Sequence, residues 1–179
     1  MSDLLHAALA IAHAAHEGVD RKYVGLPYLT HPMAVAALVR GVTDDEAAIA
    51  AACLHDVLED APGDPEDWAR TIEARCGPAV LELVRWLTDT SRPEDGNRAA
   101  RKAIDRERLA RAPDAAQTVK LADLIDNSDS ILEHDPRFAV IYLREKSALL
   151  DVLTRGDARL LLRARRIVDD HARRAPRPR

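Results

Sequence analysis

The sequence predicts an all-α protein built as a single-domain helical bundle. Apolar residues recur at spacings of three and four in segment after segment, which is the pattern of amphipathic helices. Proline and glycine fall at the boundaries between these segments, and no run alternates apolar and polar residues as a half-buried strand would. The chain of 179 residues suffices for one domain, which we expect to span residues 1–173 and to leave residues 174–179 as a frayed tail.

The first predicted helix covers residues 3–17, where leucine, isoleucine and alanine form a wide apolar stripe. Residues 19–30 follow as a loop, because a glycine precedes them and a further glycine and a proline lie within them. Pro32 suits the first turn of a helix that runs to about residue 42, and it biases His31 away from helical geometry. We therefore place His31 at the edge between a loop and a helix.

The third predicted helix carries the most polar side chains within apolar sequence. Thr43 is a plausible cap for it, and Glu46, three residues on, would complete a capping box. The apolar run continues until Pro62, so we expect one uninterrupted helix between these signals.

The remaining predicted helices start at a proline or after an N-cap residue such as Asp or Asn, and they stop at a glycine or a proline. They cover residues 65–76, 78–87, 98–111, 114–133, 136–154 and 157–173. Asp114 and Gln117 fit a second capping box. Residues 88–97 are polar and are expected to form an exposed loop.

Composition excludes several classes of function. The net charge is −4 and aromatic residues are scarce, so neither a basic face nor a stacking platform for long nucleic acid is expected. Cys53 and Cys76 lack metal-type spacing, which favours a reducing compartment. No basic leader precedes an apolar stretch, and no window is long enough to span a membrane. These observations predict a cytoplasmic protein without a membrane partner.

The stretch at residues 51–60 reads Ala-Ala-Cys-Leu-His-Asp-Val-Leu-Glu-Asp. Buried acids and imidazoles are normally paired or bound to a metal. On one helix His55, Asp56, Glu59 and Asp60 can line one cavity, and three acids this close would repel one another unless a cation lies among them. A frayed helix end with solvated acids is the alternative.

Two further segments supply the same kind of side chain. His31 adjoins an apolar helix, and Asp123 is flanked by core-type residues, with Asn127 following on the same helical face. Together with His55 and Asp56 they form a mixed nitrogen and oxygen set suited to Mn²⁺, Fe²⁺ or Zn²⁺, with two coordination places left open on an octahedral ion. Such an ion could activate water and polarise a phosphoryl oxygen.

The chain resembles the HD superfamily of metal-dependent phosphohydrolases, named for a His-Asp doublet. It is similar in particular to the hydrolase domain of RelA/SpoT enzymes and to small stand-alone alarmone hydrolases of the metazoan SpoT homologue type. The resemblance covers roughly residues 7–151. The motifs that carry it are Arg21-Lys22, Gly25, Pro27-Tyr28, His31-Pro32, Leu54-His55-Asp56-Val57, Glu59-Asp60, Val119-Lys120-Leu121-Ala122-Asp123 and Asn127.

This resemblance implies an HD-type helical fold and a Mn²⁺ enzyme that removes the 3′-pyrophosphate from guanosine tetra- and pentaphosphate. Residues that match functional positions of the family are His31, His55, Asp56 and Asp123 for the metal, Glu59 and Asp60 for the attacking water, Asn127 for the sugar and phosphate, and Arg21 and Lys22 for the base. The implied partner is a small nucleotide. The oligomeric state is not predicted.

Three positions depart from the family pattern. Leu124, Asp126 and Asp129 stand where many relatives carry Lys or Arg, His or Tyr, and Arg. If these side chains point into the pocket, they would repel a highly charged substrate. Other hypotheses therefore stay open: hydrolysis of an adenine alarmone, a dinucleotide phosphate or a nucleoside monophosphate, or a catalytically silent helical module that binds nucleotide. Weaker candidates for substrate contact are Arg98, Arg101, Lys102, Arg144 and Lys146.

Overall fold

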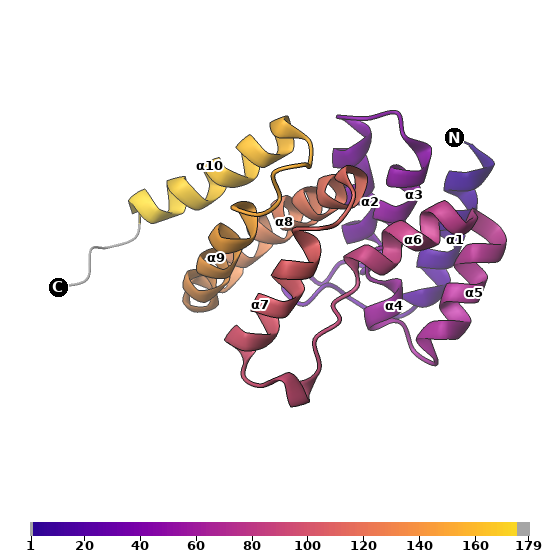
Figure 1. The fold of residues 1–179 in the computed structure, drawn as a ribbon, viewed down its shortest axis with the longest axis horizontal. Helices are drawn as coiled ribbons and strands as arrows, with labels where there is room; N and C mark the ends of the chain where they lie inside the picture. The colour runs from indigo at the N-terminus through magenta and orange to yellow at the C-terminus, as the bar shows by residue number, and fades with distance from the viewer. Residues whose placement is uncertain (1, 175–179) are drawn as a thin grey trace.

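The computed structural model describes residues 2–174 and confirms the all-α prediction (Figure 1). Its helices are α1 (Asp3–Ala15), α2 (Thr30–Arg40), α3 (Glu46–Leu54), α4 (Val57–Asp60), α5 (Pro65–Cys76), α6 (Pro78–Leu87), the 3₁₀ turn η1 (Pro93–Asp95), α7 (Arg98–Leu109), α8 (Asp114–His134), α9 (Pro136–Leu150) and α10 (Ala158–Arg174). The described residues contain no strand, only an isolated bridge between Asp20 and Pro27. Of the predicted tail, residues 175–179 lie outside the described range, and Arg174 is still helical.

Helix α3 is the centre of the bundle. It packs against α1, α2, α6 and α8, and every residue from Ala48 to Leu54 is buried. Four alanines in this run let neighbouring helices approach its backbone closely, at native packing density. Because α3 is apolar on all sides, it lies inside the bundle, and His55 at its C-terminal end is buried in the middle of the molecule.

The predicted single helix from Thr43 to Pro62 is wrong at two points. Asp45 is the N-cap, since its side chain accepts from the backbone N–H groups of the next turn, and Thr43 instead accepts from the Asp45 N–H. The helix also breaks after Leu54 and resumes as α4. The break turns the side chains of His55 and Asp56, which would diverge by about 100° on a regular helix, toward one another.

Two other local predictions fail for tertiary reasons. Helix α2 begins at Thr30, so His31 lies within its first turn despite the following proline. The predicted capping box at Asp114 does not form, because Gln117 is fully buried. Its amide donates to the Leu109 carbonyl at 2.9 Å and accepts from the Arg155 N–H at 2.9 Å, tying α7 and the α9–α10 connection to α8.

Helices α7, α9 and α10 lie on one side of the molecule and α1 to α6 on the other, and α8 runs from the second group toward the first (Figure 1). Helices α5 and α6 have the predicted bounds, whereas α9 ends at Leu150 instead of residue 154. None of the helices within residues 2–174 is both long enough and apolar enough to cross a bilayer.

Candidate metal centre

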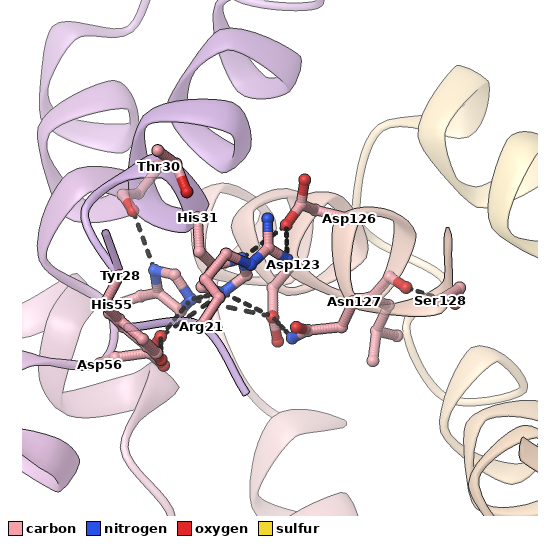
Figure 2. Close-up of polar contacts among 12 residues, drawn as sticks. Arg21, Tyr28, Thr30, His31, His55, Asp56, Asp123, Asp126, Asn127 and Ser128 are labelled. Carbon is pink, nitrogen blue, oxygen red and sulfur yellow. Dashed lines mark hydrogen bonds and ion pairs between the residues drawn. The ribbon is translucent and has the colours of Figure 1, made fainter. Parts of the chain in front are cut away.

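Two buried histidines from different helices face each other. His31 comes from the first turn of α2 and His55 from the break after α3, and their Nε2 atoms lie 3.2 Å apart (Figure 2). The two residues are 3% and 2% exposed. Two imidazole nitrogens at this distance, shielded from water, need a proton or a cation between them.

The opposite ring nitrogens are held by acceptors. His31 Nδ1 donates to Asp126 Oδ2 at 2.7 Å, and His55 Nδ1 donates to the Ala52 carbonyl at 2.9 Å. With both Nδ1 atoms protonated, the neutral rings present their Nε2 lone pairs to the same point. This arrangement fixes histidine tautomers in metal sites.

The two predicted carboxylate ligands reach the same point. Asp56 Oδ2 lies 3.1 Å from His55 Nε2 and 3.4 Å from His31 Nε2. Asp123 Oδ1 lies 3.4 Å from His31 Nε2 and 3.7 Å from His55 Nε2. The ligand atoms of His31, His55 and Asp123 lie within 4.8 Å of one another, so this group could hold a metal ion. The structure thus brings together all four residues predicted as ligands.

The site stabilises positive charge on its rings and negative charge on its acids. Burial lowers the pKa of His31, but hydrogen bonds to Asp123, Asp126 and Asp56 outweigh burial and raise it to about 11. Burial also lowers the pKa of His55, but the neighbouring acids, chiefly Asp56, outweigh burial and raise it to about 9. The pKa of Asp56 is held well below its usual value by His55 and His31, although burial acts the other way. A divalent cation in place of the Nε2 protons would meet two neutral imidazoles and two carboxylates, which is a donor set suited to it.

Tyr28 and the predicted catalytic acids border the ligands. The Tyr28 hydroxyl lies 2.7 Å from Asp56 Oδ2 and 3.3 Å from Asp60 Oδ2. Glu59 accepts from the backbone N–H of Asp89. Glu59 and Asp60 both keep contact with solvent, but desolvation by the surrounding protein and the charge of Asp89 raise the pKa of Glu59 to about 7, and desolvation also raises that of Asp60. A carboxylate with a pKa near neutrality suits a general base.

Arg21 and Lys22, the predicted basic pair, lie in different surroundings. Arg21 makes an ion pair with Asp126 at 2.7 Å and so lies beside His31 (Figure 2). Lys22 is exposed, and its ammonium lies 4.9 Å from the centre of the Tyr23 ring. The structure does not bring Lys22 to the metal ligands through any contact among the described residues.

The three side chains that depart from the family pattern lie in different surroundings. Asp126 points into the site, but Arg21 and His31 neutralise its charge in place. Asp129 is exposed, and Leu124 is buried in the wall of a cavity. Repulsion of an anionic substrate by Asp126 and Asp129 is therefore weaker than their charges alone suggest.

Two side chains of α8 hold the last ligand. Asn127 Nδ2 donates to Asp123 Oδ1 at 2.5 Å, and Lys120 Nζ lies 2.8 Å from Asp123 Oδ2. From the sequence, Lys120 and Tyr28 are only parts of motifs and Asp126 is only a departure from the family pattern, so none of the three has a predicted role in holding the ligands. The spacing of three residues between Lys120 and Asp123 on a helix was a usable signal for that pair.

A cavity of about 510 Å³ opens on this centre between α7, α8 and α9. Asp123 and Asn127 form part of its wall, and so do Lys120 and Lys102. Because Asp123 belongs to both the wall and the ligand group, a molecule in the cavity lies next to the candidate metal centre.

The sequence model of the HD domain matches residues 8–148, so this chain belongs to the HD domain family, as its motifs predicted. The chain is 39% identical over 127 residues to the probable guanosine-3′,5′-bis(diphosphate) 3′-pyrophosphohydrolase of Synechocystis sp. (strain ATCC 27184 / PCC 6803 / Kazusa). That match covers 69% of this chain and 16% of the Synechocystis protein.

Two further relatives are closer in size. The guanosine-3′,5′-bis(diphosphate) 3′-pyrophosphohydrolase MESH1 of Drosophila melanogaster is 35% identical over 112 residues, which is 62% of this chain and 59% of that protein. A solved structure described as a metazoan orthologue of SpoT that hydrolyzes ppGpp superposes with a TM-score of 0.82 and 27% identity. That superposition covers 96% of this chain and 97% of the other.

Proposed function

We propose that this chain is a metal-dependent phosphohydrolase that removes the 3′-pyrophosphate of guanosine tetra- and pentaphosphate. The observation that carries the proposal is the convergence of His31, His55, Asp56 and Asp123 beside a cavity. The activities named for the Synechocystis and Drosophila relatives, and for the metazoan SpoT orthologue, supply the substrate class. The proposed domain spans residues 1–173.

In this proposal the four converging residues are the ligands of one divalent ion, and Mn²⁺ is the proposed occupant. When bound, the ion would lower the pKa of a water molecule and polarise a phosphoryl oxygen. Asp126 and the Ala52 carbonyl keep the two imidazoles in the tautomer that offers Nε2. Asn127 and Lys120 hold the Asp123 carboxylate in place.

Glu59 and Asp60 are proposed to accept the proton of the attacking water. The pKa of Glu59, raised to about 7, lies near working pH, which is the condition for effective general-base catalysis, and the pKa of Asp60 is raised above its ordinary value. Tyr28 bridges Asp60 to Asp56, and so fixes the spacing between the proton acceptors and the ligands.

The proposed substrate is a free nucleotide in the cytoplasm, and neither a long nucleic acid nor a membrane. Arg21, Lys22 and Asn127 are proposed to bind it. Asp126 occupies only part of the Arg21 guanidinium, whose five donors and flat face leave room for a base. Asn127 lies in the cavity wall, where the sugar and phosphate would pass.

The test is a turnover assay of the purified chain with Mn²⁺ and guanosine tetraphosphate, resolved by anion-exchange chromatography. We expect guanosine diphosphate and pyrophosphate in equal amounts, and no product from Asp123→Ala. A parallel panel contains an adenine alarmone, a dinucleotide phosphate and a nucleoside monophosphate. Release of orthophosphate, or turnover of a panel member in preference to the guanosine alarmone, would replace the proposed substrate. Binding without any turnover would indicate a silent module.

A further inference from the structure

Lys146 is a buried cation that faces the cavity. It lies on α9, is 4% exposed and lines the same cavity as Asp123 and Asn127. Its ammonium donates to the Leu124 carbonyl at 2.7 Å and lies 4.1 Å from the centre of the Tyr142 ring. Position 124 of α8 is a leucine, where many relatives carry Lys or Arg. The basic side chain in this part of the wall is therefore Lys146 of α9.

The ion pairs of the cavity wall distinguish Lys146 from its neighbours. Three cations of the wall are each held by an acid: Lys120 by Asp123 at 2.8 Å, Lys102 by Asp89 at 2.7 Å and Arg98 by Glu145 at 2.7 Å. Within residues 2–174 no carboxylate lies within 4.0 Å of the Lys146 ammonium. Arg106 and Arg144, which also line the cavity, keep contact with solvent.

The contacts of Lys146 leave its charge uncompensated. An ammonium has three donors, and the single acceptor here, the Leu124 carbonyl, also accepts from the Ser128 hydroxyl at 2.6 Å. A buried charge without a counter-ion is costly, and burial holds the pKa of Lys146 well below its usual range. An anion in the cavity would remove that cost and make charge-assisted hydrogen bonds.

We propose that Lys146 binds the pyrophosphate group of the substrate inside this cavity and is a specificity-determining residue of the site. This inference rests on the proposed function. The cavity joins the candidate metal centre at Asp123, so a phosphate chain that starts at the metal centre extends along a wall where Lys146 is the buried, unpaired cation. A substrate with a single phosphate would leave that cation uncompensated.

The first test is steady-state kinetics of the full chain with Mn²⁺ and guanosine tetraphosphate. Lys146→Met removes the charge at similar volume, and we expect KM to rise about tenfold or more, the effect of losing one charge-assisted hydrogen bond, with little change in kcat. Lys146→Arg should restore most of the loss. Arg163→Met, which deletes an exposed charge on α10, is the matched control and should leave both constants unchanged.

The second test uses the wild-type chain without metal and does not depend on turnover; a variant serves only to assign the signal. The chain contains four lysines, so ¹³Cε labelling gives four signals, and the one absent from Lys146→Arg identifies Lys146. Inorganic pyrophosphate should shift this signal toward that of a charged ammonium.

These readouts separate the two proposals. A wild-type chain that hydrolyses guanosine tetraphosphate, with a Lys146 signal indifferent to pyrophosphate and an unchanged KM in Lys146→Met, overturns the inference and keeps the proposed function. A Lys146 signal that responds to pyrophosphate in a chain without turnover supports the anion site and rejects the proposed hydrolase.

Discussion

Asp126 shows how a side chain that looks unfavourable in sequence can be useful in the fold. Its Oδ2 accepts from His31 Nδ1 and from Arg21 Nη2, both at 2.7 Å, across separations of 95 and 105 residues. One carboxylate therefore orients a candidate metal ligand and a candidate base-binding residue at once. A linear sequence carries no local sign of either contact, so it does not predict the direction of this side chain.

At the residue scale, Asp126→Asn should weaken Mn²⁺ binding by about 10- to 100-fold, because the carboxylate that fixes the His31 tautomer is lost. Isothermal titration with Mn²⁺ measures the effect. Asp129→Asn on the exposed face of the same helix is the control and should leave the affinity unchanged. Equal affinities of the two variants would show that Asp126 has no part in holding His31.

Glu59 gives a prediction of pH dependence. A general base acts as the carboxylate, and the pKa of Glu59 is raised to about 7, so kcat should fall as pH drops through a midpoint at or somewhat below 7. A bound cation favours the ionised form and moves the midpoint down.

Glu59→Gln should keep metal binding and lose roughly 10²- to 10⁴-fold in kcat, the usual contribution of a general base. Profiles of kcat between about pH 5 and 9 for both proteins make the comparison. If Glu59→Gln keeps the wild-type kcat and the same fall in kcat at low pH, Glu59 is not the general base.

At the scale of elements, the central position of α3 explains one success and one failure of sequence reasoning. Its apolar run predicted a buried helix, and α3 is buried from Ala48 to Leu54. The break at His55 was not predicted, because the cap and proline signals around it describe one continuous helix. The break is stabilised by a local hydrogen bond from His55 to the Ala52 carbonyl and by a tertiary one that Asp56 accepts from the Tyr28 hydroxyl.

Gly156 sets how closely the α9–α10 connection approaches α8. A Cβ at this position would lie 2.7 Å from Leu121 Cδ1 and 3.1 Å from the Gln117 carbonyl carbon. Gly156→Ala should therefore lower the free energy of unfolding by about 1–3 kcal/mol through overpacking against the α8 backbone.

Urea unfolding measures that change. Gly41→Ala is the matched control, because its backbone is helical and its nearest neighbour would lie at 3.3 Å, so a smaller loss is expected. A Gly156→Ala protein as stable as the wild type would mean that the connection shifts freely relative to α8.

At the scale of the whole molecule, the bundle brings three distant segments to one point. The apolar setting of each polar residue and the resemblance to HD hydrolases were enough to predict which four side chains would meet. The cavity was beyond such reasoning, since α7, α8 and α9 are placed by long-range contacts such as the ion pair between Arg98 and Glu145. Lys146 was for this reason only a weak candidate in sequence, although it is the buried cation of that wall.

The central claim is that one divalent ion is held by His31, His55, Asp56 and Asp123. Electron paramagnetic resonance during a Mn²⁺ titration counts bound ions directly. We expect one Mn²⁺ per wild-type chain. In His55→Ala and Asp123→Ala proteins with native far-UV circular dichroism, we expect an affinity lower by about a hundredfold or more, because losing a ligand costs at least as much as losing its outer-shell partner. A wild-type chain that binds no Mn²⁺, or folded variants that bind it as tightly as the wild type, would contradict it.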